Sequence, residues 1–251
     1  MRGRGYCSIN WIEQIMKIFI LTTKTTHHIY FVKKIATYYD IHTTILETKP
    51  VIPTFDTFHS FENDREIYER EELLREKDPS FKKYSETIEF NNINCKGCVE
   101  FISKHRPDII IVFGTGIIKE AIIEKCSEGI INLHGGDPQF YRGLDSHLWA
   151  IYHKEFSYLK VCLHKVNKRI DDGEIIELRT IIIKKDLELF MLRSETTRLC
   201  IKATLSALKK YEEVDYFQSF DQKSKGRYYS FMPSVLKEIC LKNFNQYLRS
   251  L

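Results

Sequence analysis

Apolar residues along this chain follow two kinds of pattern. The short run at 108–113 is almost continuously apolar, which is typical of a strand buried on both faces of a sheet, and the short runs at 17–21 and 41–46 also predict strands. Over 27–39 the apolar residues instead return every three or four positions, which predicts a helix. Strand, helix and strand in this order, with short connections, predict a parallel sheet.

The same two patterns continue through the rest of the chain. They predict helices over 97–105, 117–126, 145–153, 187–211 and 235–248, and strands over 130–133, 159–166 and 174–184. The highly charged stretch 50–86 predicts a solvated helix and surface loops. The fold class we expect is α/β, a doubly wound and mostly parallel sheet, with the main domain at 16–211 and a short C-terminal extension at 212–251. Residues 1–15 are basic and polar, so we expect a disordered or non-native extension before a start at Met16.

Composition narrows the classes of protein to consider. Of the 251 residues 43% are hydrophobic, enough for a packed core, and the net charge of +4 is too small and too dispersed to predict a nucleic-acid binder. No apolar run reaches the roughly 18 residues that a membrane helix needs. The seven cysteines are odd in number and scattered, which indicates a reduced, cytoplasmic protein. Cys95 and Cys98 form the one close pair, but further zinc ligands at suitable spacing are missing, so we expect free thiols near a helix start and no metal.

Candidate chemistry gathers around the apolar run 130–133. Asn132 and His134 are two residues apart on an extended segment, so their side chains point to the same side. The Asn132 amide can donate to a developing oxyanion, and the His134 imidazole can take the proton of an attacking amine and then donate as imidazolium. A carboxylate from Asp171 or Asp172 can fold back to orient that imidazole. This set predicts acyl transfer to an amine.

Two other motifs carry less weight. The Gly-Thr-Gly segment 114–116 begins like a dinucleotide-binding turn, but position 119 is lysine where that turn needs a third glycine. The His-Gly-Gly segment 134–136 is similar to an esterase oxyanion loop, yet the serines that follow lack the Gly-x-Ser-x-Gly setting which that chemistry needs. We therefore expect neither a bound dinucleotide nor a serine hydrolase.

These residues resemble a known family. The Asn-x-His of 132–134, the Tyr-Arg-Gly loop 141–143 and the Ile-Asp-x-Gly-Glu-Ile segment 170–175 are similar to motifs of the folate-dependent formyltransferases. That family includes glycinamide ribonucleotide and methionyl-tRNA formyltransferases and the nucleotide-sugar N-formyltransferases. The resemblance covers about 16–211 and implies a Rossmann-like catalytic domain. It places the family's catalytic residues on Asn132, His134 and Asp171, and the Asp-x-Gly pattern favours Asp171 over Asp172.

The resemblance also implies binding residues. A formyl donor, N10-formyltetrahydrofolate, is expected to border the turn that follows the strand 108–113 and the stretch that leads into the catalytic aspartate. The residues expected at this donor are Phe113, Gly114, Thr115, Gly116, Ile117, Ile118, Val166, Lys168 and Ile170. The residues expected at the acceptor are Gly135, Gly136, Tyr141, Arg142, Asp145, Ser146 and His147, of which the last five can equally be loop structure. The resemblance implies no metal.

Differences between this sequence and other branches of the family reduce the number of acceptors to consider. Gly-Gly follows His134 where the tRNA and purine branches usually carry Ser-Leu-Leu-Pro, and the segment after Tyr211 is too short for the basic β-barrel of the tRNA enzymes. The Gly-Gly loop, the start at 26–31 and the tail at 228–233 are similar to members of polysaccharide pathways.

The acceptor we expect is therefore a dTDP-linked amino-dideoxy sugar used in O-antigen or lipopolysaccharide synthesis. Its first candidate is dTDP-4-amino-4,6-dideoxyglucose, and the 3-amino isomer is the second. A methionyl-tRNA or glycinamide ribonucleotide formyltransferase and a non-catalytic folate-binding relative are the alternatives. The resemblance also implies a homodimer, and we expect its interface on the last two helices.

Overall fold

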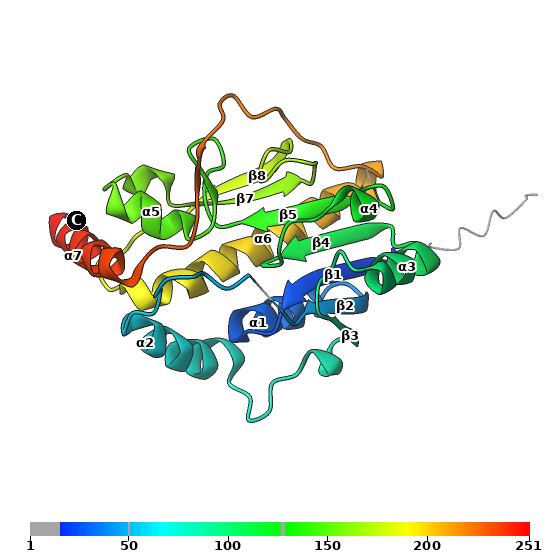
Figure 1. The fold of residues 1–251 in the computed structure, drawn as a ribbon, viewed down its shortest axis with the longest axis horizontal. Coiled ribbons are helices and arrows are strands. Elements are labelled where there is room, and N and C mark those ends of the chain that lie inside the picture. The colour runs from blue at the N-terminus through cyan, green and yellow to red at the C-terminus, as the bar shows by residue number, and fades with distance from the viewer. Residues whose placement is uncertain (1–15, 50, 127–128) are drawn as a thin grey trace, which may run out of the picture.

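The centre of the molecule is a seven-stranded sheet (Figure 1), seen in a computed structural model that describes residues 16–49, 51–126 and 129–251. Its strands are β1 (Ile18–Thr23), β2 (Ile41–Glu47), β3 (Glu86–Phe90), β4 (Ile109–Phe113), β5 (Ile130–His134), β7 (Lys160–Lys165) and β8 (Ile175–Thr180). Their order is β3-β2-β1-β4-β5-β7-β8. The pairs from β3 to β5 are parallel, and β7 pairs antiparallel with both β5 and β8. The predicted doubly wound, mostly parallel α/β sheet is confirmed.

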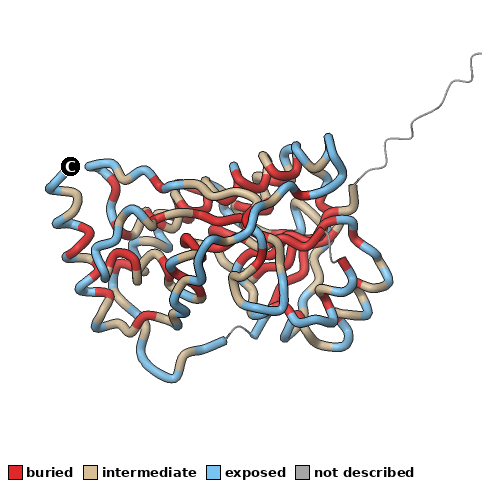
Figure 2. The backbone as a smooth tube through the Cα atoms, turned by 90° about the horizontal axis from the view of Figure 1, so that it is seen from above, coloured by how far each residue is buried: buried red, intermediate tan, exposed pale blue. Residues whose placement is uncertain are grey.

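Helices cover both faces of this sheet. Ile18 and Ile20 of β1 pack into one core with α1 (Thr26–Ile35) and α6 (Leu192–Val214). Phe19 and Leu21, which alternate with them, pack into a second core with α3 (Lys96–His105) and α4 (Glu120–Ile123). Figure 2 shows the buried strands running through the middle of the molecule between more exposed segments. Burial on both faces explains why the central strands are apolar at successive positions.

The segment after α6 closes the other end of the molecule. β9 (Arg227–Tyr229) pairs in parallel with β6 (Tyr141–Gly143), in the loop after β5. α7 (Ser234–Ser250) packs against α5 (Ser146–Tyr152) around a third core that includes Met232 and Phe244. In Figure 1 the orange segment that leads to α7 passes over β7 and β8. The expected C-terminal extension therefore shares a core with the loop beside the candidate site.

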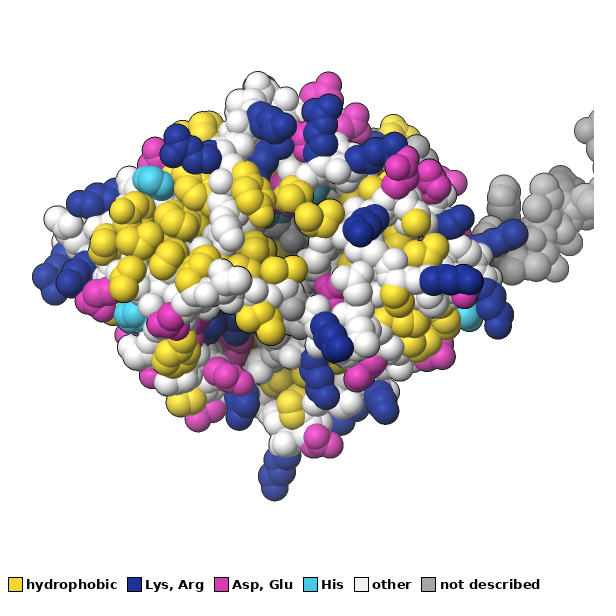
Figure 3. Space-filling model, viewed as in Figure 1, with side chains coloured by type: hydrophobic (Ala, Val, Ile, Leu, Met, Phe, Trp, Pro, Cys, Tyr) yellow, Lys and Arg dark blue, Asp and Glu magenta, His cyan; other side chains and the backbone are white. Residues whose placement is uncertain are grey.

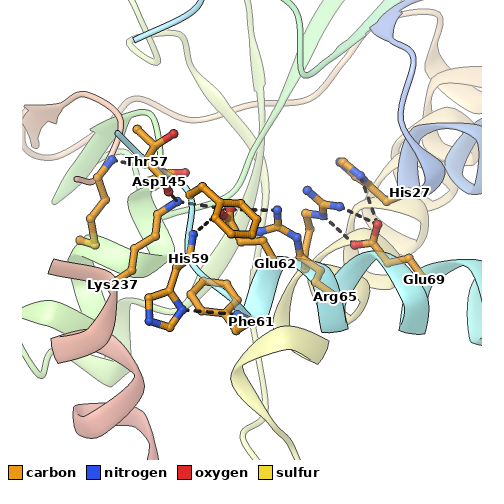
Figure 4. A network of polar contacts seen from close by, with 12 residues as sticks. His27, Thr57, His59, Phe61, Glu62, Arg65, Glu69, Asp145 and Lys237 are labelled. Atoms are coloured by element: carbon orange, nitrogen blue, oxygen red, sulfur yellow. Dashed lines mark hydrogen bonds and ion pairs between the residues drawn. The ribbon is translucent and has the colours of Figure 1, made fainter. Parts of the chain in front are cut away.

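A buried polar network ties α7 to the segment 51–69 (Figure 4). Lys237 of α7 donates from Nζ to the carbonyl of Thr57 at 2.5 Å and to Glu62 Oε1 at 3.2 Å. Glu62 belongs to α2 (Phe61–Tyr68) and also accepts a hydrogen bond from Arg65 at 3.0 Å. Buried Glu69, one helical turn after Arg65, forms a bidentate pair with Arg193 of α6 at 2.6 and 2.7 Å.

Several details differ from the sequence prediction. The helix expected over 117–126 is a single turn in α4, and the one expected over 27–39 ends at Ile35. The stretch 50–86 is not only a solvated surface, because Leu74 and Phe81 are buried in the core beneath α1. The expectation for residues 1–15 lies outside the described residues.

Two further observations concern the described part of the chain. None of its helices has the length and apolar character of a membrane-spanning segment. Its cysteines are free thiols, and Cys98 is buried in the core beneath α3, where burial raises the pKa of its thiol to about 12. Burial in apolar surroundings thus disfavours the thiolate, which is the reactive form of cysteine.

Candidate active site

Three side chains predicted to carry the chemistry meet where β5 ends. Asn132 and His134 lie on β5, and Asp171 lies in the turn between β7 and β8. The His134 Nδ1 is 3.5 Å from Asp171 Oδ2. Asp172, the other candidate carboxylate, instead pairs with Arg142 at 2.6 Å. The site lies at the carboxyl ends of the parallel strands, where open α/β sheets bind their ligands.

Asp171 is held in place from several directions. Its backbone has a left-handed conformation (φ 49°), which aspartate adopts more readily than most residues. Its Oδ2 accepts a hydrogen bond from the backbone N–H of Gly143 at 2.8 Å, and its carbonyl accepts one from Gln222 Nε2 at 2.9 Å. Burial opposes the charge of the carboxylate, but two neighbouring imidazoles and the backbone N–H outweigh burial and hold the pKa of Asp171 well below its ordinary value. Asp171 is therefore an anion throughout the neutral range.

His134 is surrounded by hydrogen-bond acceptors. Its side chain is only 6% exposed, and Nε2 donates to the carbonyl of Tyr141 at 2.8 Å while Nδ1 faces Asp171. A doubly protonated imidazole offers a proton to both acceptors, whereas a neutral one can satisfy only one of them. The Asp171 carboxylate can therefore stabilise the positive charge that the ring gains when it takes up a proton. To take up a proton at Nε2, the ring would first have to release the Tyr141 carbonyl.

His164 belongs to this cluster and is the residue that the sequence analysis missed. It lies on β7 directly opposite Asn132, and its Nε2 is 3.1 Å from Asn132 Nδ2 and 3.5 Å from Asp171 Oδ1. The signal in the sequence is a histidine within the alternating strand pattern of 159–166. That pattern does not give the register which places His164 opposite Asn132.

The turn 114–118, expected at the formyl donor, follows β4 at the same edge of the sheet. Gly114 has a φ of 78°, and a Cβ there would lie 2.4 Å from the ring of His28. The N–H of Gly116 donates to the buried Glu47 carboxylate at 2.7 Å. Ile117 is 58% exposed. The turn thus presents backbone and one apolar side chain to the outside.

The other residues expected at the donor follow β7. Val166 packs against the core beneath α3, and its N–H donates to the carbonyl of Ile130 at 3.0 Å. Lys168 forms an ion pair with Glu120 at the start of α4. Since β5 lies between β4 and β7, the two groups of expected donor residues flank the strand that carries Asn132 and His134.

Tyr141 and Arg142, expected at the acceptor, are both 3% exposed and engaged within the protein. The Tyr141 hydroxyl contacts the Glu155 carboxylate, and Arg142 pairs with Asp172 and donates to the carbonyl of Pro138 at 3.0 Å. These contacts support the interpretation that both residues stabilise the loop. Contact with an acceptor stays a prediction.

Asp145, Ser146 and His147 begin α5 and are also engaged. Asp145 accepts the backbone N–H of Met232 at 2.8 Å, and burial raises the pKa of this carboxyl. The Ser146 hydroxyl donates to the carbonyl of Gly143 at 3.3 Å. His147 donates from Nε2 to a backbone carbonyl at 2.6 Å, and burial lowers its pKa to about 4.

The second of the two glycines after His134 is required by close packing. A Cβ on Gly136 would lie 2.8 Å from His134 Nε2 and 2.9 Å from Ser146 Cβ, whereas one on Gly135 would meet the His147 ring at an ordinary 3.5 Å. Gly136 therefore lets the chain pass directly beside the imidazole. Within the described ranges, no group of three or more His, Cys, Asp or Glu side chains is placed to hold a metal ion.

The sequence is similar to a known protein family and to part of a known protein. The model of the family described as "Formyl transferase" matches residues 54–207. The bifunctional polymyxin resistance protein ArnA of Wigglesworthia glossinidia brevipalpis is 35% identical over 95 residues, which cover 38% of this chain and 14% of that protein. This chain therefore matches only a small part of that relative.

Solved structures share the fold. A sugar N-formyltransferase from Shewanella sp. FDAARGOS_354 superposes with a TM-score of 0.60 at 14% identity, covering 92% of this chain and 88% of that one. HypX from Aquifex aeolicus in complex with tetrahydrofolic acid gives 0.59 at 17% identity, covering 90% of this chain and 34% of that one. The formyltransferase PseJ from Anoxybacillus kamchatkensis, in complex with UDP-4,6-dideoxy-4-formamido-L-AltNAc and tetrahydrofolate, gives 0.52 at 18% identity, covering 94% and 91%. At these identities the likeness is one of fold.

Proposed function

Because this chain belongs to the formyl transferase family, we propose that it moves a formyl group from N10-formyltetrahydrofolate to the amine of a nucleotide-linked amino sugar. The observation that carries the proposal is the cluster of Asn132, His134 and Asp171 at the end of β5, with His134 placed 3.5 Å from a carboxylate whose pKa lies well below its ordinary value. An amide donor, an imidazole and an orienting anion are what acyl transfer to an amine requires.

Each residue of the cluster has a separate task in the proposed reaction. The unprotonated amine attacks the formyl carbon, so that a C–N bond forms and the formyl oxygen becomes an oxyanion. Asn132 donates an N–H to that oxyanion, a contact of a kind worth about 10²–10³ in kcat. Once Nε2 of the neutral ring has released the Tyr141 carbonyl, His134 takes the proton of the attacking amine there. The resulting imidazolium donates to the oxyanion and then delivers the proton to N10, as the formyl C=O re-forms and the bond from the formyl carbon to N10 breaks. Asp171 orients His134 and stabilises its charged form.

The edge of the sheet offers a suitable place for the donor. Gly114 is exposed in the turn after β4, so its backbone is accessible to a flat heterocycle, and Ile117 adds exposed apolar surface beside it. Tetrahydrofolate is named in the complexes of HypX and PseJ, whose fold this chain shares. We therefore place the folate between this turn and the stretch 166–170.

For the acceptor we propose a dTDP-linked amino-dideoxy sugar, with dTDP-4-amino-4,6-dideoxyglucose as the first candidate and its 3-amino isomer as the second. The support comes from the Gly-Gly loop beside His134 and from the sugar N-formyltransferases that share the fold. Such a product would serve O-antigen or lipopolysaccharide synthesis. We further propose that the enzyme is a cytoplasmic homodimer that pairs through its last two helices, α6 and α7. Apolar side chains gather on the surface at the end of the molecule where α5 and α7 lie (Figure 3).

The test is a transfer assay with a panel of acceptors. Purified protein is incubated with N10-formyltetrahydrofolate and, separately, with both dTDP-amino sugars, UDP-linked amino sugars, glycinamide ribotide and methionyl-tRNA. Mass spectrometry detects the formylated product, and absorbance follows the release of tetrahydrofolate. We expect formylation of a dTDP-amino sugar by the wild type and loss of most turnover in His134→Asn.

The result also separates the alternatives. Formylation of glycinamide ribotide or methionyl-tRNA without any sugar would reject the proposed acceptor while keeping the chemistry. Folate binding by calorimetry without transfer to any acceptor would indicate a non-catalytic relative. An unaltered rate in His134→Asn would reject the assignment of the reaction centre.

A further inference from the structure

We propose that His164 is a positioning residue that holds the amide of Asn132 with an N–H, rather than its oxygen, available to the formyl oxygen. The inference rests on the proposed function, because it assigns Asn132 to the oxyanion. It concerns a residue that none of the sequence motifs include, and it follows from the partners of the two imidazole nitrogens.

The backbone determines which nitrogen of His164 carries the proton. Nδ1 lies 2.8 Å from the carbonyl oxygen of Lys165, and a carbonyl can only accept a hydrogen bond. Nδ1 must therefore be protonated. In the neutral ring this leaves a lone pair on Nε2, which makes Nε2 an acceptor.

That lone pair in turn determines the orientation of Asn132. Nε2 of His164 lies 3.1 Å from Asn132 Nδ2, so the amide donates one of its two hydrogens to the ring. Turning the amide over would place its oxygen against the lone pair of Nε2, and two acceptors repel each other. The second hydrogen of Nδ2 remains free for a substrate oxygen. Among the described residues, His164 is the one side chain that is hydrogen-bonded to this amide.

Burial makes this control effective. His164 is 3% exposed, so water has little access to replace its hydrogen bond to Asn132. The two residues are direct partners in the antiparallel pairing of β5 with β7, and the strands therefore hold their side chains together. Nε2 has two polar neighbours, Asn132 Nδ2 at 3.1 Å and Asp171 Oδ1 at 3.5 Å, and the amide is the nearer of them.

The test uses two substitutions of His164: one keeps the acceptor at the position of Nε2, and the other keeps the donor at the position of Nδ1. His164→Gln places an amide oxygen near the position of Nε2, where it can accept from Asn132. His164→Asn places an amide nitrogen near the position of Nδ1, where it can still donate to the Lys165 carbonyl but offers nothing to Asn132. We expect His164→Asn to lower kcat by about 10–100-fold, part of the loss seen when an oxyanion donor is removed, with KM for both substrates nearly unchanged. His164→Gln should recover most of that loss.

A double-mutant cycle shows whether His164 acts through Asn132. In an Asn132→Ala background, His164→Asn should lower kcat little further, because the amide that it orients is already absent. Equal losses of kcat in the Gln and Asn variants, or full additivity with Asn132→Ala, would reduce His164 to a packing residue and overturn the inference.

A spectroscopic measurement tests the inference without any substrate. In protein labelled with ¹⁵N at histidine, the chemical shifts of His164 should report a protonated Nδ1 and an unprotonated Nε2. A proton on Nε2, in the neutral ring or in an imidazolium, would overturn the inference directly, because Nε2 would then be a donor towards Asn132. If the wild type formylates no acceptor, the proposed function fails, but this measurement still decides the state of His164.

Discussion

Gly136 and His134 lie so close that a methyl group on the Cα of Gly136 would be 2.8 Å from the His134 Nε2. Gly136→Ala should therefore displace the imidazole from Asp171 and from the Tyr141 carbonyl. We expect kcat to fall by about 100-fold, within the range that a positioned general base supplies. The measurement is steady-state kinetics together with thermal unfolding.

A matched control is Gly97→Ala. A Cβ there would meet only the Phe90 ring, at an ordinary 3.4 Å, and Gly97 lies in α3 away from the reaction centre. This variant should keep the wild-type rate. A Gly136→Ala enzyme as active as Gly97→Ala would mean that the imidazole tolerates displacement.

Asp171 faces His134, whereas its neighbour Asp172 pairs with Arg142, so substitution of Asp171 should affect turnover and substitution of Asp172 should affect stability. Asp171→Asn should remove most turnover and leave the protein folded. Asp172→Ala leaves the buried guanidinium of Arg142 without its partner at 2.6 Å, and breaking such a pair costs about 3–5 kcal/mol. We expect this variant to lose stability, measured by urea unfolding.

The control for Asp172 is its exposed partner. Arg169 lies 3.4 Å from Asp172 with its side chain 73% exposed, so Arg169→Ala should change stability by less than about 1 kcal/mol. Stability unchanged in Asp172→Ala, with turnover abolished, would instead make Asp172 the catalytic carboxylate.

His28 should make the protein sensitive to acid. Burial lowers its pKa from 6.5 to about 3. Between these two values the unfolded chain binds a proton that the folded protein does not, so stability falls as the pH decreases, by about 1.4 kcal/mol per pH unit from this residue. Urea unfolding of wild type and His28→Asn at pH 7, 6, 5 and 4 should show a shallower dependence in the variant. Parallel curves would show that His28 takes up its proton in the folded state as easily as in the unfolded chain.

Gln222 should affect activity although it lies far along the chain from the reaction centre. Its Nε2 donates to the carbonyls of Asp171 and Gly173, both at 2.9 Å, and its Oε1 accepts from Arg142 at 3.0 Å. Gln222→Ala should loosen the turn that carries Asp171 and cost about 1–2 kcal/mol of stability. A smaller kcat should accompany that loss. The exposed Gln218 provides a control, because Gln218→Ala should leave both quantities unchanged.

The sequence predicts the centre of this fold better than its periphery. Strands such as 108–113 are recognisable because burial on both faces makes them continuously apolar. The strands β6 and β9 have three residues each and exist only through their mutual pairing, so no local pattern of apolar residues predicts them. Leu74 and Phe81 stand in a charged stretch, and only the packing of α1 shows that they are core residues.

Some residues of the candidate site could also be predicted from the sequence, and others could not. The family motifs led to Asn132, His134 and Asp171, which the structure brings together. His164 could not be assigned from the sequence, because its importance depends on the register between two antiparallel strands. The burial of Arg142 depends on its ion pair with Asp172, which no sequence pattern shows.

The pairing of β6 with β9 has a consequence for the order in which the protein forms. Synthesis from the N-terminus produces β1 to β5 early, and these strands can pair while later residues are still being added. Tyr141, whose carbonyl binds the His134 imidazole, gains its strand partner Arg227 only after all of α6 has emerged. Contacts between residues so far apart in the chain form slowly. A nascent chain would thus present His134 on a finished strand well before its surroundings exist, and we expect formyl transfer to begin only with the last folding step.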